Sequence, residues 1–266
     1  MMQDLDTVSQ ADLLQVQAVL TDIDDTLTTH GRLPAVAYDA LERLQAAGIK
    51  VVPITGRPAG WCDHIARMWP VDGVVGENGA FYFRYDVAAK RMIRKYAQDV
   101  VIRKANVARV HALAQEILQE FPGTALASDQ AYREIDVAID FCEDVPALPL
   151  SVAQAIATRF HKAGAEAKVS SIHVNAWFGK HDKLSMSLRL LAELYGWNAA
   201  AAKMRVAYCG DSPNDSPMFG YFPMSVGVAN IRPLSHLMEH LPSYVTRAEG
   251  GQGFAEFAEM LLAARR

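Results

Sequence analysis

Short apolar runs and helical apolar stripes alternate along the first 85 residues of this chain. The mostly apolar runs at 16–20, 49–54 and 73–75 have the length of buried strands, and polar residues or glycines follow each of them. Residues 34–47 and 59–68 instead repeat their apolar positions every three to four residues, as a helix with one buried face does. Strands and helices in this order predict βαβ units and hence a parallel sheet.

The pattern changes between about residue 86 and residue 177. Residues 135–141 carry large apolar side chains at every second position, with Asp136, Ala138 and Asp140 between them, which is the period of a half-buried antiparallel strand. Ser171, His173 and Asn175 alternate with apolar neighbours in the same way. We expect this segment to form a separate α+β layer whose sheet keeps one polar face.

After residue 178 the alternation of helices and strands returns. We therefore predict an α/β fold: a doubly wound parallel-sheet core formed by residues 1–85 and 178–266, into which residues 86–177 are inserted as an α+β cap. The remaining predicted elements are a strand at 81–84, helices at 106–121, 151–162, 181–195 and 253–264, and strands at 205–209, 226–229 and 244–246.

The composition is that of a globular protein, with 51% hydrophobic and 21% charged residues over 266 positions. The net charge of −4 and the lack of any Lys/Arg run give no basis for nucleic acid as a partner. No apolar run is long enough to cross a bilayer, so no membrane partner is expected, and the polar, acidic N-terminus does not resemble a signal peptide. Cys62, Cys142 and Cys209 are too far apart for a zinc site, so we expect free thiols in a cytoplasmic protein.

Polar side chains follow several of the predicted strands. Ligands in parallel α/β sheets bind at the carboxyl ends of the strands, so these side chains are expected to meet in one crevice. Oxygen ligands at such density suit Mg²⁺. The residues concerned are Asp22 and Asp24 after the first strand, Thr55 after the second, Asp211 and Asp215 after the strand at 205–209, and Lys183 at the start of the preceding helix.

Each of these groups also has an ordinary explanation when it is taken alone. Asp22 and Asp24 could lie in a solvated loop, and residues 211–215 could form a turn with a helix cap. Lys183 could be a solvated lysine, and Lys180 is its rival for a place in the site. The order and spacing of the groups together favour a site.

In that order the motifs resemble those of the haloacid dehalogenase-like superfamily, specifically its phosphatases with a C2-type cap, and the resemblance covers nearly the whole chain. Motif one is Asp22-Ile23-Asp24-Asp25-Thr26, motif two is Thr55-Gly56-Arg57, motif three is Lys183, and motif four is Gly210-Asp211-Ser212-Pro213-Asn214-Asp215. The loops Glu77-Asn78-Gly79 and Gly227-Val228-Ala229-Asn230 are similar to the branch called IIB or Cof-like, which includes sucrose-phosphate, trehalose-phosphate and mannosylphosphoglycerate phosphatases. One departure is Asp25-Thr26, where Asp-Gly-Thr is commoner.

The resemblance implies a role for each matched residue. Asp22 would be the nucleophile that forms an aspartyl phosphate, and Asp24 would be the general acid and then the general base. Thr55 and Lys183 would hold the transferring phosphoryl oxygens. Mg²⁺ would be bound by Asp22, by the backbone carbonyl of Asp24 and by Asp211, while Asp215 would orient Lys183 or a water molecule of the ion.

Substrate selection is expected to lie with the cap and with the loops beside the motifs, because a lid that closes over the site would contact the substrate. Arg57 could contact substrate or only fix its own loop, and the polar positions of the cap strands could simply be exposed to solvent. The predicted substrate-binding residues are Gly56, Arg57, Asn78, Arg133, His173, Asn175 and Asn214.

The resemblance thus implies Mg²⁺-dependent hydrolysis of a small-molecule phosphate monoester, such as the phosphate of a sugar or a similar polyol. A phosphomutase of the same fold is an alternative activity, and a phosphosugar-binding or regulatory module without catalysis is an alternative of another class. Dehalogenation is disfavoured because that chemistry does without the second aspartate, here Asp24. The oligomeric state is not predicted by the sequence.

Overall fold

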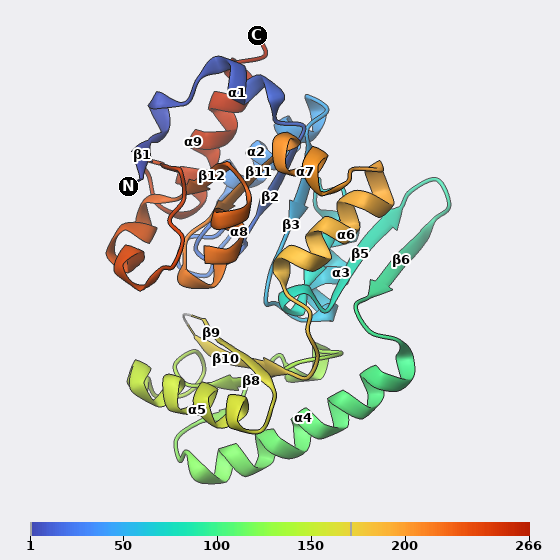
Figure 1. The fold of residues 1–266 in the computed structure, drawn as a ribbon, viewed down its shortest axis with the longest axis vertical. Coiled ribbons are helices and arrows are strands. Elements are labelled where there is room, and N and C mark those ends of the chain that lie inside the picture. The colour runs from blue at the N-terminus through green and yellow to red at the C-terminus, as the bar shows by residue number, and fades with distance from the viewer. Residues whose placement is uncertain (1, 171) are drawn as a thin grey trace.

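The computed structural model describes residues 2–170 and 172–266 and shows two lobes, one above the other in Figure 1. The larger lobe is built on a six-stranded sheet in which all neighbouring strands run parallel, which confirms the predicted α/β fold. Its strands lie in the order β1 (Gln3–Asp4), β13 (Tyr244–Val245), β12 (Met224–Gly227), β11 (Val206–Gly210), β2 (Ala18–Thr21) and β3 (Lys50–Pro53).

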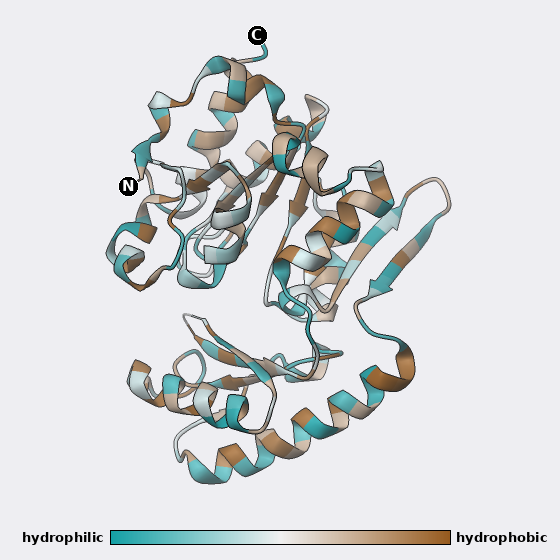
Figure 2. Ribbon diagram, viewed as in Figure 1, coloured by the Kyte–Doolittle hydropathy of each residue, from teal (hydrophilic) through white to brown (hydrophobic). Residues whose placement is uncertain are grey.

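Helices cover both faces of this sheet, so its central strands are apolar on both sides, as their brown colour in Figure 2 shows. Val19 packs in an apolar cluster with helices on one face of the sheet, whereas its neighbour Leu20 packs in a second cluster with helices on the other face. The first face carries α1 (Gln10–Gln15), α2 (Ala35–Ala46), α3 (Ala59–Met68) and α9 (Gly250–Ala263), and the second carries α6 (Lys183–Tyr195), α7 (Ala199–Arg205) and α8 (Ser216–Tyr221).

A three-stranded antiparallel sheet continues the core beyond β3, to which a parallel bridge between Ile54 and Val75 joins it. Its strands are β4 (Val74–Gly76), β5 (Phe81–Asp86) and β6 (Arg91–Tyr96). The strand β6 lies inside the segment that we assigned to the cap, yet it pairs with β5 along its whole length. The domain boundaries stay a prediction, and we propose that the cap begins after β6.

The smaller lobe is an antiparallel sheet with two helices on the face turned away from the core (Figure 1). Apolar side chains of these two helices pack with those of the central strands in a third cluster, so this lobe has a core of its own. The strands lie in the order β7 (Ala125–Leu126), β8 (Val137–Asp140), β10 (His173–Trp177) and β9 (Glu166–Val169), and the helices are α4 (Val100–Glu120) and α5 (Leu150–Lys162).

The prediction that the cap strands are half-buried was wrong. Both β8 and β10 are buried along their whole length, including the polar side chains of Asp140, His173 and Asn175. Their polar face is turned toward the core lobe, which takes it out of solvent. A strand pattern shows that a face is polar but not what covers it.

Two predicted helices begin earlier than expected. The helix predicted at 106–121 begins at Val100, because the Asp99 side chain accepts hydrogen bonds from the N–H groups of Val101 and Ile102. The helix predicted at 253–264 begins at Gly250, whose N–H donates to the Asn230 side chain. The strand β1 and the helix α1 in the polar N-terminal segment were not predicted.

Along the described ranges 2–170 and 172–266, no helix combines the length and the apolar character needed to cross a membrane.

Candidate active site

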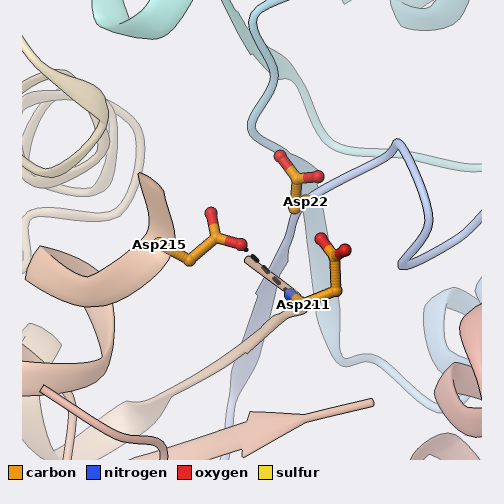
Figure 3. Close-up of side chains that lie close together, drawn as sticks. All are labelled: Asp22, Asp211 and Asp215. Atoms are coloured by element: carbon orange, nitrogen blue, oxygen red, sulfur yellow. Dashed lines mark hydrogen bonds between the residues drawn. The ribbon is translucent and has the colours of Figure 1, made fainter. Parts of the chain in front are cut away.

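The adjacent strands β2 and β11 bring the first and the last acidic motifs together. They pair Thr21 with Cys209, and the N–H of Asp22 donates to the Cys209 carbonyl oxygen at 2.9 Å. Asp22 and Asp211 therefore lie side by side at the carboxyl end of the sheet (Figure 3). Carboxylate oxygens of Asp22, Asp211 and Asp215 all lie within 4.8 Å of one another.

Asp215 organises the loop that follows β11. Its Oδ2 accepts hydrogen bonds from the N–H groups of Asp211 at 3.1 Å, drawn as a dashed line in Figure 3, and of Ser212 at 3.3 Å. Its Oδ1 accepts from the Tyr208 hydroxyl at 2.5 Å and from the Lys183 Nζ at 2.9 Å. A side chain at Gly210 would meet the Asp215 carboxylate at 2.5 Å, so the loop needs glycine there.

Lys183 is the cation of this cluster. It is the first residue of α6, and Asp182 before it caps the helix and fixes its start. Its Nζ lies 2.7 Å from Asp22 Oδ1 and 2.9 Å from Asp215 Oδ1, and these two carboxylates hold the pKa of Lys183 above its usual range despite its burial. The rival Lys180 is exposed, so the structure brings Lys183 and not Lys180 to the carboxylates.

Three buried carboxylates lie together here, and the one ammonium contacts only Asp22 and Asp215, which leaves an excess of negative charge. Burial raises the pKa of Asp22 to about 8, and the neighbouring Asp215 and Asp24 charges oppose its ionisation further. The pKa of Asp211 is likewise raised well above its usual range by burial and by the Asp215 and Asp22 carboxylates. Oxygen donors that lack a balancing charge fit a small divalent cation such as Mg²⁺.

Asp24 is turned toward a different partner. Its carboxylate accepts three hydrogen bonds from the Arg57 guanidinium, at 3.1, 3.1 and 2.9 Å. The Nη1 of Arg57 lies 3.5 Å from Glu143 and 3.8 Å from Asp129, both of the cap. The N–H of Arg57 donates to the Thr55 hydroxyl oxygen at 2.9 Å, so motif two and the second aspartate of motif one form one network.

A cavity of about 990 Å³ opens between the two lobes over this cluster. Asp22, Asp24 and Asp211 line it, whereas Thr55, Lys183 and Asp215 are buried and are not among its lining residues. Ser171, which we expected on the polar face of the cap, lies outside the described residues. All seven predicted substrate-binding residues line the cavity: Gly56, Arg57, Asn78 and Asn214 from the core and Arg133, His173 and Asn175 from the cap.

The sequence model of the haloacid dehalogenase-like hydrolase family matches residues 19–134, which include motifs one and two and the loop at 77–79. The predicted resemblance to the haloacid dehalogenase-like superfamily is confirmed. No match was found among curated proteins.

Solved structures share the haloacid dehalogenase-like fold of both lobes. Protein 0175 of Thermoplasma acidophilum is 16% identical, with a TM-score of 0.69 over 93% of this chain and 98% of that one. A HAD/COF-like hydrolase from Plasmodium vivax is 16% identical, with a TM-score of 0.68 over 96% and 99%. The sucrose-phosphatase from Synechocystis sp. PCC6803, solved with sucrose and phosphate, is 16% identical, with a TM-score of 0.64 over 93% and 98%.

Glu77 is a residue of this site whose role the sequence did not predict. Its carboxylate is fully buried and accepts hydrogen bonds from four backbone N–H groups, one in the core and three at the entry to β8. It therefore ties the cap to the loop that carries Asn78. The Gly76-Glu77-Asn78-Gly79 stretch indicates a tight loop. The cap N–H groups that donate to Glu77 lie 57 to 59 residues further along the chain, and no sequence spacing predicts such a contact.

Two predicted cap residues are held by their neighbours. The Nη1 of Arg133 donates to the Gly56 carbonyl oxygen and to Asp136, both at 2.9 Å, so it also links cap and core. His173 is buried, and burial together with the Arg133 charge lowers its pKa to about 4, which makes the imidazole neutral near pH 7. The Nε2 of His173 lies 2.9 Å from Glu143 Oε2, so a neutral His173 with its proton on Nε2 can donate to that carboxylate and accept a hydrogen bond at its other ring nitrogen.

Proposed function

We propose that this protein is a Mg²⁺-dependent phosphatase that hydrolyses a phosphate monoester of a sugar or a similar polyol through an aspartyl-phosphate intermediate. The observation that carries the proposal is the convergence of Asp22, Lys183 and Asp211 from three separate elements: Asp22 and Asp211 line one cavity, and the buried Lys183 contacts Asp22.

The reaction would take place in two displacements. A carboxylate oxygen of Asp22 attacks phosphorus, the bond from phosphorus to the alcohol oxygen breaks, and Asp24 gives its proton to the leaving alcohol. Asp24, now a carboxylate, then takes a proton from water, whose oxygen attacks the aspartyl phosphate and releases Asp22 and phosphate. Asp24 lines the cavity and stands two residues after Asp22, which supports this division of roles.

The other residues would hold charge in place. Asp22, Asp211 and the backbone carbonyl of Asp24 would bind Mg²⁺, which neutralises the repulsion between the nucleophile and the phosphate dianion. All contacts of the Asp215 carboxylate described above are to Tyr208, Lys183 and its own loop, so we assign it the positioning of Lys183. The Thr55 oxygen accepts from the backbone N–H of Arg57, so we assign Thr55 the positioning of the loop that carries Gly56 and Arg57.

The polar side of the cavity supports a polyol as the alcohol. The side-chain amide nitrogen of Asn78 is buried and makes no hydrogen bond to any residue in the described part of the chain. A buried donor without a partner costs about 1–3 kcal/mol. Asn78 lines the cavity, and a rotation of its side chain toward the cavity would let a hydroxyl or phosphoryl oxygen of the substrate offset that cost. His173 and Asn175 add further hydrogen-bonding groups from the cap.

The test is phosphate release from p-nitrophenyl phosphate and from a panel of sugar phosphates, with MgCl₂ or with EDTA. We expect release only with Mg²⁺, without any bisphosphate activator. Asp22→Asn should abolish release while the circular dichroism spectrum stays that of the wild type. Asp39→Asn, the same chemical change on the exposed face of α2, is the control and should keep full activity. Wild-type activity in Asp22→Asn would show that the nucleophile is assigned wrongly.

A further inference from the structure

The cavity has a second kind of lining beside its polar groups. Pro233, Leu234 and Leu237 reach it from the 3-10 helix η5 (Ala229–Leu237) of the core. Leu148 and Leu150 reach it from the cap at the start of α5. Apolar side chains of both lobes therefore meet in the same space.

Leu148 packs against the core of the cap, but the three other leucines do not belong to the protein core. Among the described residues, three apolar clusters form the interior of the two lobes, and Leu150, Leu234 and Leu237 belong to none of them. Leu150 is 50% exposed and Leu237 is 52% exposed. A single exposed leucine is ordinary, but apolar side chains that converge on one cavity from two lobes form a binding surface.

The apolar surface is joined directly to the catalytic cluster. Asn230, in the first turn of η5, donates from its side-chain amide to Asp211 Oδ2 at 3.2 Å and to the Asp25 carbonyl oxygen at 3.0 Å. Leu234 and Leu237 follow on the same helix, so the acidic cluster sets their position. A ligand anchored at Asp22 and Asp211 can extend along η5 without leaving the cavity.

The size of the cavity also favours a ligand that carries an apolar group. Pockets of about 300–1,000 Å³ enclose drug-sized ligands, and the volume of about 990 Å³ lies at the upper end of that range. A phosphorylated monosaccharide alone would leave much of this space to water, against leucine side chains. Apolar surface in contact with water is unfavourable, and an apolar group of the ligand would remove that contact.

We propose that the substrate is an amphipathic phosphate monoester: the phosphate, then a hydroxyl-bearing part, then an apolar group of several carbons that lies between η5 and the start of α5. The inference rests on the proposed phosphatase activity and specifies its substrate. The polar residues of the cap contact the hydroxyl-bearing part, and the leucines of the two lobes select the apolar group.

The test compares two substrates that differ only in the apolar group: glycerol 3-phosphate and 1-O-hexylglycerol 3-phosphate, the latter below its micelle concentration. We expect a kcat/KM at least about tenfold higher for the hexyl ether, since a single methylene in an apolar pocket can be worth that factor. The double variant Leu234→Asn/Leu237→Asn should lose most of this preference and keep its rate on glycerol 3-phosphate. The control is Met204→Asn on α7. The Met204 side chain is 66% exposed and does not line the cavity, so this variant should keep the preference for the hexyl ether.

The outcomes separate the two proposals. Equal kcat/KM for the two substrates in the wild type, or a preference that survives the double variant, would overturn the apolar site and leave the phosphatase standing. No Mg²⁺-dependent hydrolysis of either substrate, of p-nitrophenyl phosphate or of any sugar phosphate would overturn the phosphatase itself and the inference with it.

Discussion

Lys183 is one buried cation that serves two buried carboxylates, Asp22 and Asp215. Removing one partner of a buried charge network leaves the others uncompensated, and this is costlier than losing a surface ion pair. The residue therefore matters for stability as well as for the position of Asp22, the proposed nucleophile.

We expect Lys183→Met to lower the free energy of unfolding by about 3 kcal/mol in the absence of metal, and kcat/KM by at least about a hundredfold. Urea unfolding and phosphate release measure the two effects. Lys180→Met is the matched control, and because Lys180 is exposed it should change the unfolding free energy by less than about 0.5 kcal/mol. Equal effects of the two substitutions would show that Lys183 is assigned to the site wrongly.

Arg57 was predicted from the sequence as a substrate contact or as a loop anchor. Its guanidinium makes three hydrogen bonds to Asp24 and lies close to Glu143 and Asp129 of the cap. We propose that Arg57 positions Asp24 when the cap lies over the core.

Lysine cannot reproduce the forked contact of a guanidinium with a carboxylate. Arg57→Lys should therefore lower kcat by at least about tenfold and change KM by less than about threefold, because a misplaced acid slows the chemical step but not binding. Steady-state kinetics on one sugar phosphate measure both constants. A raised KM with an unchanged kcat would instead make Arg57 a substrate-binding residue.

The loop from Gly76 to Gly79 joins three parts of the molecule. Glu77 holds the start of β8, Asn78 lines the cavity, and Gly79 packs against the start of α6. Gly79 has a φ of +99°, and an added Cβ would lie 2.0 Å from the Asp182 carbonyl oxygen. The close packing of this loop against Asp182 thus helps to place Lys183, which directly follows Asp182 in the sequence.

Gly79→Ala should destabilise the protein by about 2 kcal/mol more than Gly164→Ala does. Gly164 is the matched control: its φ is +80°, but an added Cβ would meet nothing within 4 Å, so only backbone strain is shared by the two variants. Chemical denaturation measures the difference. Equal losses would mean that the loop and α6 can separate without cost.

The two lobes enclose an acidic cluster, and this couples stability to pH and to metal. The pKa of Asp22 is raised in the folded protein to about 8, so the native state binds its proton more tightly than the unfolded chain does. This contribution to stability is present at low pH and is lost as the pH rises from about 4 to about 8. Asp211, whose pKa is also raised, acts in the same direction.

Mg²⁺ needs both carboxylates ionised, so its stabilising effect should increase over the same range. At about a hundred times its dissociation constant, Mg²⁺ should raise the melting temperature by about 5 °C near pH 8, and by less near pH 6. Thermal melts with MgCl₂, against NaCl of equal ionic strength, measure this. Mg²⁺ should no longer raise the melting temperature of Asp211→Asn. An equal increase of the melting temperature in that variant would show that the ion binds at another site.

The core and its acidic residues could be predicted because they depend on local pattern. Apolar runs ending in Asp22, Thr55 and Asp211 mark strand ends, and strand ends of a parallel sheet share one edge. The cap pattern was interpreted correctly as a sheet with a polar face, but that face is covered, and Asp140 and His173 are buried on it. Glu77 was missed because its partners are backbone N–H groups, which have no sequence signature.

The order of strands and helices, the strand ends and the residue types at those ends were determined by the sequence alone, since each follows from the period of apolar positions over a few residues. The tertiary structure decided which of these groups meet: Lys183 with Asp22 across 161 positions, and Arg57 with Asp24. It also placed the leucines of η5 and those of the cap around one cavity. The physical reason is that periodicity records only which side of an element is buried. Distances between side chains depend on how whole elements pack, to which every residue of the core contributes.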